Sequence, residues 1–336
     1  MMLIRGEFLV IILTQVLVLA ILPLNQPRVR RCKMKILMTG ATGLIGRALC
    51  HALNEDGHTI VGVSRSSRTP AGLEVAEMHE WDSQAGPPPE AALDQVDAVI
   101  NLAGEPIAAK RWSDQQKKSI RDSRILTTRN LVEGMRRASR KPQLFVSGSA
   151  VGYYGNRGDE RLEETSPPGR GFMSDLCVEW EREATPASEL GIRVVLVRTG
   201  VVFSADGGAL DKILPPFKMG VGGRLGSGKQ WFPWIHIDDI VGIFKHTIQN
   251  SQVAGPFNAA APQGATNAEF TRELGRALHR PVFLPVPEFA LRALMGEMAN
   301  VLFDSQRVIP AAALSSGYEF RHPQLGPALA DVLSRK

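Results

Sequence analysis

Three glycines stand at a spacing suited to binding a pyrophosphate. Gly40, Gly43 and Gly46 form the pattern G-x-x-G-x-x-G between the apolar run KILMT and a segment of helical periodicity. Because glycine has no Cβ, a phosphate can approach the backbone closely, and the amides at the start of a helix attract its negative charge. A glycine-rich turn can also serve turn chemistry alone, but the strand-turn-helix context favours a dinucleotide. We predict that it is bound by Gly40, Thr42, Gly43, Leu44, Ile45 and Gly46.

The end of the second apolar run bears on which dinucleotide binds. An acidic side chain there holds the ribose hydroxyls of NAD, whereas an arginine can accommodate the 2′-phosphate of NADP. The run ends Val63-Ser64-Arg65, and Arg68 follows closely. The sequence therefore favours NADP(H) over NAD(H), with Arg65 as the contact, while the alternative is that Arg65 is a solvated surface side chain.

The segments that must position these residues alternate in character. Six apolar runs are rich in Val, Ile and Leu, at 35–40, 58–65, 75–81, 97–104, 143–150 and 192–200. Helix-length segments separate several of them, at 44–56, 113–139 and 173–189. Nearly continuous apolar strands alternating with helices are typical of a parallel sheet covered on both faces. We predict an α/β fold, a Rossmann doubly wound parallel sheet with a small C-terminal α/β lobe.

The small lobe is expected to begin near residue 260. Helical patterns at 267–278 and 289–302 flank the run PVFLPVP. In the second pattern we interpret the residues at helical spacing as core packing, namely Leu294, Met295, Met298, Val301 and Leu302. The predicted organisation is an N-terminal extension at 1–33, a dinucleotide-binding domain at 34–259 and a C-terminal domain at 260–336.

The charge of the chain is distributed unevenly. The net charge is +5, yet the first 33 residues hold five basic side chains and one acidic, and the rest of the chain holds 34 basic and 33 acidic. A nearly neutral body argues against nucleic acid as a partner. With 44% hydrophobic and 22% charged residues, the chain is neither wholly disordered nor a polytopic membrane protein. The three cysteines form no C-x-x-C pair, so we predict no metal site and a cytoplasmic location.

Residues 8–24 form an apolar run of about 17 residues, interrupted by Thr14 and Gln15, at the short limit for a bilayer span. Two interpretations remain open. Translation could start at Met34, where a strand begins at once, or the run could be a membrane anchor. Only in the second case is a membrane a partner, and the basic residues after the run would then keep the domain in the cytoplasm.

Six motifs together resemble the extended short-chain dehydrogenase/reductase superfamily, specifically the NAD-dependent epimerase/dehydratase-like branch with a small extra C-terminal domain. Its members often bear names such as epimerase family protein or cell-division-inhibitor-like protein. The motifs are TGATGLIG (39–46), NLAGEPI (101–107), VSGSAVGYYG (146–155), VRTGVV (197–202), GSGKQWFPWIHIDDI (226–240) and VIPAAALSSGYEFRHPQLGPAL (308–329). They are spread from residue 39 to residue 329, so the resemblance extends over essentially all of the chain from residue 34 onward.

The resemblance implies a catalytic Ser or Thr after the fifth strand and a Y-x-x-x-K motif on the next helix, whose lysine lowers the pKa of the tyrosine. Ser149 fits the first role, but Phe172 and Leu176 stand where the tyrosine and the lysine belong. Either another acid serves, with Tyr153 and Tyr154 as the nearest phenols, or the protein binds its cofactor without turnover. The expected activity is that of an oxidoreductase or epimerase on a small carbonyl or hydroxyl substrate, and the alternative is a cofactor-binding sensor.

The resemblance also implies further contacts to the cofactor. Leu102, Ala103 and Gly104 would lie beside the ribose, and Asp82 would meet the adenine amino group or be a solvated loop acid. Arg124 would contact a phosphate, although an exposed helical arginine fits the pattern better.

Four side chains of the second half have both a structural and a functional interpretation. Arg198 could be a buried structural pair or a substrate ligand, and His236 suits a structural role better than a catalytic one. Trp231 and Trp234 line either a substrate cleft or the core. The identity of the small-molecule substrate and the oligomeric state are not encoded in any readable pattern.

Overall fold

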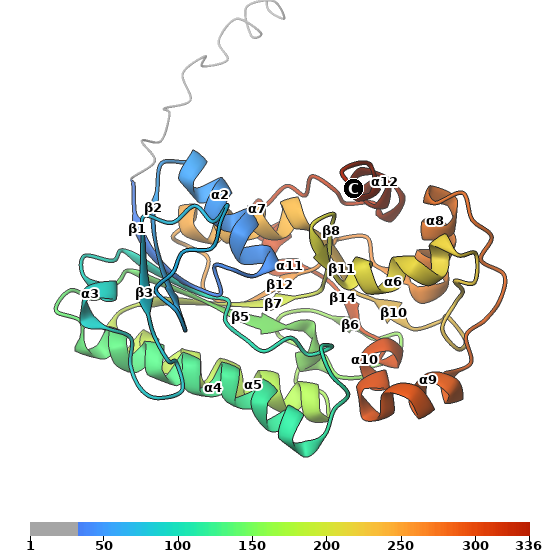
Figure 1. The fold of residues 1–336 in the computed structure, drawn as a ribbon, viewed down its shortest axis with the longest axis horizontal. Coiled ribbons are helices and arrows are strands. Elements are labelled where there is room, and N and C mark those ends of the chain that lie inside the picture. The colour runs from blue at the N-terminus through green and yellow to red at the C-terminus, as the bar shows by residue number, and fades with distance from the viewer. Residues whose placement is uncertain (1–32) are drawn as a thin grey trace, which may run out of the picture. The chain divides into compact units, whose positions relative to one another are not determined.

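Seven parallel strands form the central sheet of the computed structural model, which describes residues 33–336 (Figure 1). The strand order is β12-β7-β5-β4-β1-β2-β3. The bounds are β1 (Lys35–Thr39), β2 (Thr59–Ser64), β3 (Glu77–Glu80), β4 (Ala98–Asn101), β5 (Leu144–Ala150), β7 (Arg193–Thr199) and β12 (Gly255–Ala259). The doubly wound parallel sheet is therefore confirmed.

The strand order reverses at β1, which pairs with β2 on one side and with β4 on the other. At such a reversal the loops after neighbouring strands diverge, and a crevice opens at the carboxyl ends of the strands. In register, Thr39 of β1 faces Asn101 of β4, and Ser149 of β5 faces Arg198 of β7. The sheet thus brings together residues that lie far apart in the chain.

Helices cover both faces of the sheet (Figure 1). On one face lie α2 (Leu44–Glu55), α7 (Ile237–Gln249) and α11 (Ala311–Ser315), and on the other α3 (Glu90–Leu93), α4 (Asp114–Arg137) and α5 (Phe172–Ala184). Side chains alternate along β1, so Ile36 and Met38 join the first core and Leu37 joins the second. The helix expected at 173–189 ends earlier, because η2 (Thr185–Leu190), with a proline in its first turn, continues it as a 3₁₀-helix.

Short strands and helices lie outside the central sheet, most of them around a third core. This core includes Phe203, Trp234, Phe270 and Leu329. The strands are β6 (Arg161–Leu162), β8 (Val201–Ser204), β9 (Gly207–Gly208), β10 (Trp231–Phe232), β11 (Trp234–His236), β13 (Ala265–Thr266) and β14 (Arg307–Val308). The helices are η1 (Val151–Tyr154), α6 (Ala209–Lys218), α8 (Asn267–Ala277) and α12 (Leu325–Ser334).

The helical pattern at 289–302 folds into three short pieces, α9 (Glu288–Met295), η3 (Gly296–Ala299) and α10 (Asn300–Phe303). Our prediction that its apolar residues form core packing is wrong, because α9 contributes no buried residue. Leu294 is 73% exposed and Val301 is 39% exposed. Helical spacing indicates that apolar side chains share a face, but it does not indicate that anything covers that face.

No helix within residues 33–336 is both long enough and apolar enough to cross a bilayer. The apolar run at 8–24 and its two interpretations lie outside the described residues.

Candidate dinucleotide and catalytic site

The turn between β1 and α2 has room only for glycine at two of its three glycine positions. Gly40 has φ +66°, and a Cβ there would lie 2.6 Å from the carbonyl carbon of Leu102. A Cβ on Gly46 would lie 2.2 Å from the carbonyl oxygen of Gly40. The helix starts after Gly43 with no side-chain cap and no acidic residue in its first turn. Its first amides are therefore free to bind an anion, as a pyrophosphate site requires.

A hydrogen-bonded pair links the ends of β1 and β4. The Thr39 hydroxyl donates to the Asn101 side-chain oxygen at 2.7 Å, and it accepts from the amides of Leu102 and Ala103 at 3.1 Å each. The side-chain amide of Asn101 in turn donates to the hydroxyl of Thr128, on α4, at 2.9 Å. These bonds fix the predicted ribose segment beside the glycine turn.

Arg124 is not the exposed helical arginine that the sequence pattern favours. Its guanidinium donates to the carbonyl oxygens of Glu105 and Ile120 at 3.0 Å each and lies 5.2 Å from the ring of Trp180. Burial lowers its pKa. A Cβ on Gly104 would lie 2.8 Å from the guanidinium carbon, so the arginine packs directly against the predicted ribose segment. A contact from Arg124 to a phosphate stays a prediction.

The residues expected at the adenosine end are exposed. Arg65 and Arg68 follow β2, the strand beside β1, and neither side chain forms an ion pair within residues 33–336. Asp82 follows β3 and accepts a hydrogen bond from the Gln84 amide at 3.0 Å. Their roles in binding a 2′-phosphate and an adenine stay predictions.

Ser149 is buried at the end of β5 and hydrogen-bonds to a carboxylate. Its hydroxyl donates to Oε1 of Glu181, on α5, at 2.6 Å. Arg198 of β7 donates to both oxygens of Glu181 at 2.8 Å. Burial opposes the charge on Arg198, but Glu181 outweighs it and raises the pKa of the guanidinium. Of the two interpretations of Arg198, the structure therefore supports the buried structural pair.

Glu181 was not recognised in the sequence, although a signal was present. Cys177, Trp180, Glu181 and Ala184 follow helical spacing and are all buried in α5. A carboxylate within an otherwise apolar stripe of a helix indicates a buried partner.

The two neighbouring tyrosines have different environments. The Tyr154 hydroxyl is fully buried, donates to the side-chain oxygen of Asn258 at 2.7 Å and accepts from Arg198 at 3.0 Å. Burial raises the pKa of Tyr154 to about 12. The ring of Tyr153 lies 3.5 Å from the guanidinium carbon of Arg198, and its hydroxyl has no hydrogen-bond partner within residues 33–336. Tyr153 therefore offers a free phenol, whereas Tyr154 is held in the core.

The positions of the absent tyrosine and lysine are filled by apolar packing. Phe172 meets Trp112 edge to face, with ring centroids 5.0 Å apart. Leu176 is buried among Ile120, Ile125 and Trp180. Neither position offers a proton.

The tryptophans of the C-terminal half also differ. Trp234 is buried in the third core, as the packing interpretation requires. Trp231 is half-buried, donates through Nε1 to Asp159 at 2.6 Å and lies 4.5 Å from the guanidinium of Arg307. It is therefore held by a polar and cationic contact at the surface of the fold.

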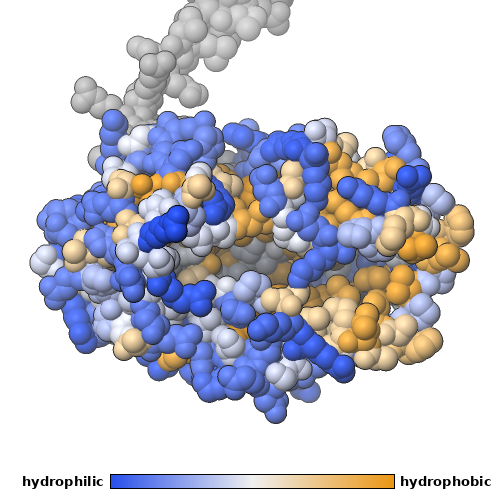
Figure 2. Space-filling model, in the orientation of Figure 1, coloured by the Kyte–Doolittle hydropathy of each residue, from blue (hydrophilic) through white to orange (hydrophobic). Residues whose placement is uncertain are grey.

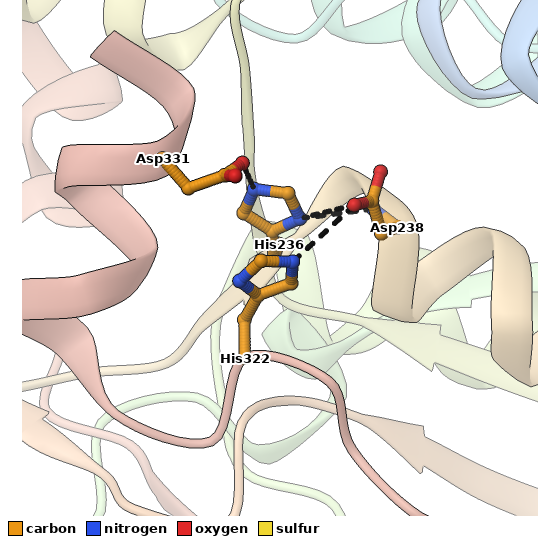
Figure 3. A group of neighbouring side chains, drawn as sticks. All are labelled: His236, Asp238, His322 and Asp331. Carbon is orange, nitrogen blue, oxygen red and sulfur yellow. Dashed lines mark hydrogen bonds and ion pairs between the residues drawn. The ribbon is translucent and has the colours of Figure 1, made fainter. Parts of the chain in front are cut away.

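His236 lies in a cluster with Asp238, His322 and Asp331 (Figure 3). Its Nε2 is 3.0 Å from Asp331, its Nδ1 accepts from the Asp238 amide at 3.1 Å, and its ring stacks on that of His322 at 3.7 Å. Burial lowers the pKa of His236.

The cation that balances these carboxylates comes from the chain itself. Arg335 pairs with Asp238 and with Asp331, at 2.7 Å in each case. The cluster is thus a partly exposed ion-pair network around the buried ring of His236, which agrees with a structural role for His236. No local pattern connects His322 and Asp331 with His236, because they lie more than 80 residues from it.

Comparison with known proteins agrees with the fold. The NAD dependent epimerase/dehydratase family matches residues 36–260, and a domain of unknown function, DUF1731, matches residues 286–332. The chain belongs to the NAD dependent epimerase/dehydratase family.

Relatives that match most of the chain include the following two. An epimerase family protein of Mycobacterium tuberculosis, MT2273, is 43% identical over 89% of this chain and 98% of its own length. The human epimerase family protein SDR39U1 is 39% identical over 90% of this chain and 100% of its own length.

Solved structures include close matches. That of human SDR39U1 (isoform 2) with NADPH superimposes with a TM-score of 0.80 at 37% identity, covering 90% of this chain and 100% of that one. A nucleoside-diphosphate sugar epimerase from Corynebacterium glutamicum gives a TM-score of 0.73 at 34% identity, covering 90% of this chain and 59% of that one.

Proposed function

We propose that the protein is an NADP(H)-dependent oxidoreductase or epimerase that acts on a small carbonyl or hydroxyl substrate, in the cytoplasm. The observation that carries the proposal is the close-fitting glycine turn after β1 together with a buried hydroxyl, Ser149, at the carboxyl end of β5 in the same sheet, with β4 between the two strands. The NADPH in the structure of human SDR39U1 supports the same choice of cofactor here.

The turn from Gly40 to Gly46 would hold the pyrophosphate, and Leu102 to Gly104 would lie along the ribose. Bound NADP(H) would supply or take up a hydride. The exposed arginines after β2, Arg65 and Arg68, would meet the 2′-phosphate.

The hydrogen bond between Ser149 and Glu181 sets what Ser149 offers to a substrate. An ionised carboxylate only accepts hydrogen bonds, so Ser149 donates to Glu181 and its lone pairs are left for a donor. A substrate hydroxyl is such a donor, and its proton would pass through Ser149 toward Glu181 as the hydride leaves. Tyr153, whose hydroxyl is free, would supply the second contact to the substrate oxygen.

A sensor that binds the cofactor without turnover is the second candidate, favoured by Phe172 and Leu176. One experiment separates the two. The purified protein is mixed with NADPH and a panel of carbonyl compounds, and with NADP⁺ and the matching alcohols, while the absorbance of NADPH is followed. A change in absorbance with any pair supports the oxidoreductase, and inversion of a substrate stereocentre without net change supports the epimerase. Steady absorbance without inversion, together with tight NADPH binding, supports the sensor. Failure to bind either NADPH or NADH in a calorimetric titration would contradict both.

A further inference from the structure

The large apolar side chains that remain exposed gather in one part of the molecule. Within residues 33–336, nine such side chains are exposed, and seven of them lie at 219–221 and 283–301. Phe283 and Phe289 are each 77% exposed. Figure 2 shows apolar atoms concentrated over α9 and the chain beside it, at the lower right of the view. Scattered single apolar residues are ordinary on a protein surface, but a gathered set marks an interaction site.

Backbone contacts bring the two segments side by side. The Val286 amide donates to the Arg224 carbonyl at 2.8 Å, and the Gly226 amide donates to the Val286 carbonyl at 2.9 Å. A Cβ on Gly223 would collide with the carbonyl oxygen of Leu284. We call the surface formed here the apolar face and define it by Met219, Val221, Phe283, Leu284, Phe289 and Leu294.

Unpaired basic side chains flank the apolar face. Residues 217–229 contain three basic residues and no acidic one, whereas in the second segment Arg276 pairs with Glu273 and Arg292 pairs with Glu288. Lys218, Arg224 and Arg280 are exposed and form no ion pair within residues 33–336. By contrast, the chain from Met34 onward is almost neutral as a whole.

We propose that the apolar face docks reversibly on an anionic lipid surface. Phe283, Phe289 and Leu294 would enter the interface between headgroups and acyl chains, and the flanking basic residues would meet lipid phosphates. Each contribution alone gives marginal attachment, and the combination gives useful binding. The negatively charged cytoplasmic leaflet has the chemistry that this face fits.

The charges favour a lipid surface over a second copy of the chain. A two-fold interface places the same patch on both subunits, so Lys218, Arg224 and Arg280 would be brought toward their own copies. Like charges across an interface oppose association, whereas an anionic leaflet attracts all of them.

The test is flotation of the full chain with vesicles of phosphatidylcholine, alone or with about 30% phosphatidylglycerol. The apolar run at 8–24 could bind lipid by itself, so every protein carries Val16→Asp and Leu19→Asp in that run. We expect binding to the anionic vesicles only, weakened by added salt. The double variant Phe283→Ser/Phe289→Ser should reduce the bound fraction about tenfold, and Lys218→Glu/Arg224→Glu should remove the preference for anionic vesicles.

The matched control is Leu314→Ser, which removes an apolar side chain that is 50% exposed on α11, outside the apolar face. It should bind like the parent, and all variants should melt at the parent's temperature because the changed side chains are exposed. A parent that floats with neither vesicle, or a phenylalanine variant that floats as well as Leu314→Ser, would overturn the proposal. A parent that ignores vesicles but is a dimer by light scattering, and a monomer after Phe283→Ser/Phe289→Ser, would assign the face to a second copy instead.

Discussion

The two halves of the candidate site differ in the groups that form them, which are backbone in one half and side chains in the other. The dinucleotide half consists of closely packed backbone, in which Gly40 and Gly46 leave no room for a Cβ. The proton-transfer half consists of side chains, and there Phe172 and Leu176 have replaced the groups that the superfamily motif supplies. A buried chain of Ser149, Glu181 and Arg198 stands in their neighbourhood. The fold can therefore retain its cofactor geometry while the chemistry at the other end changes.

The largest expected effect is on the proton-transfer half. Glu181→Ala would leave Arg198 buried and unpaired, which should cost about 3–5 kcal/mol of the free energy of unfolding. Urea denaturation measures this, with Glu183→Ala as the control, because Glu183 pairs with Arg129 at the surface and its loss should cost less than about 1 kcal/mol. Equal losses in the two variants would show that the buried pair does not hold this half together.

The next effect concerns the dinucleotide half. Gly46→Ala places a Cβ against the backbone of Gly40, so we expect loss of NADPH binding and destabilisation by about 1–3 kcal/mol. Calorimetric titration and denaturation report the two effects separately. The control is Gly86→Ala, since a Cβ on Gly86 meets nothing within 4 Å. Unchanged NADPH affinity in Gly46→Ala would refute the pyrophosphate assignment.

The three candidate hydroxyls, on Ser149, Tyr153 and Tyr154, should differ in how their removal changes kcat. With a substrate found by the panel, Ser149→Ala and Tyr153→Phe should each lower kcat by about 10²-fold or more, with NADPH affinity unchanged. Tyr154→Phe should instead lower stability by about 1–3 kcal/mol, because Asn258 loses its buried donor. Loss of turnover in Tyr154→Phe at unchanged stability would reverse the roles that we give to the two tyrosines.

The smallest effect concerns cofactor choice. The parent should bind NADPH more tightly than NADH, and Arg65→Ala should reduce that ratio by about tenfold, because an exposed arginine makes a solvent-screened contact to phosphate. Titration with both cofactors measures the ratio. Equal affinities of the parent for NADPH and NADH would be evidence against the 2′-phosphate contact.

Local patterns sufficed for six strands of the central sheet, for the glycine turn and for the absence of the tyrosine and the lysine at Phe172 and Leu176, because each depends on neighbours in the chain. They did not reveal β12, the seventh strand. The structure corrected the sequence where packing decided the outcome. The sequence pattern predicts an exposed Arg124, but this side chain packs on Gly104. It also predicts a core position for Leu294, which is exposed to solvent. The pairing of Ser149 with Glu181 spans 32 residues, and no local spacing encodes it.

The ion pairs of Arg335 have a consequence for the order of events during synthesis. The guanidinium that pairs with Asp238 and Asp331 belongs to Arg335, the C-cap residue of α12, which follows Asp238 by 97 residues. The carboxylate of Asp238 therefore receives this counter-ion only after α12 has been synthesised and has packed. A nascent chain in which α12 is not yet in place would carry partly buried acids beside His236 without their counter-ion, an open form that cellular proteases could recognise.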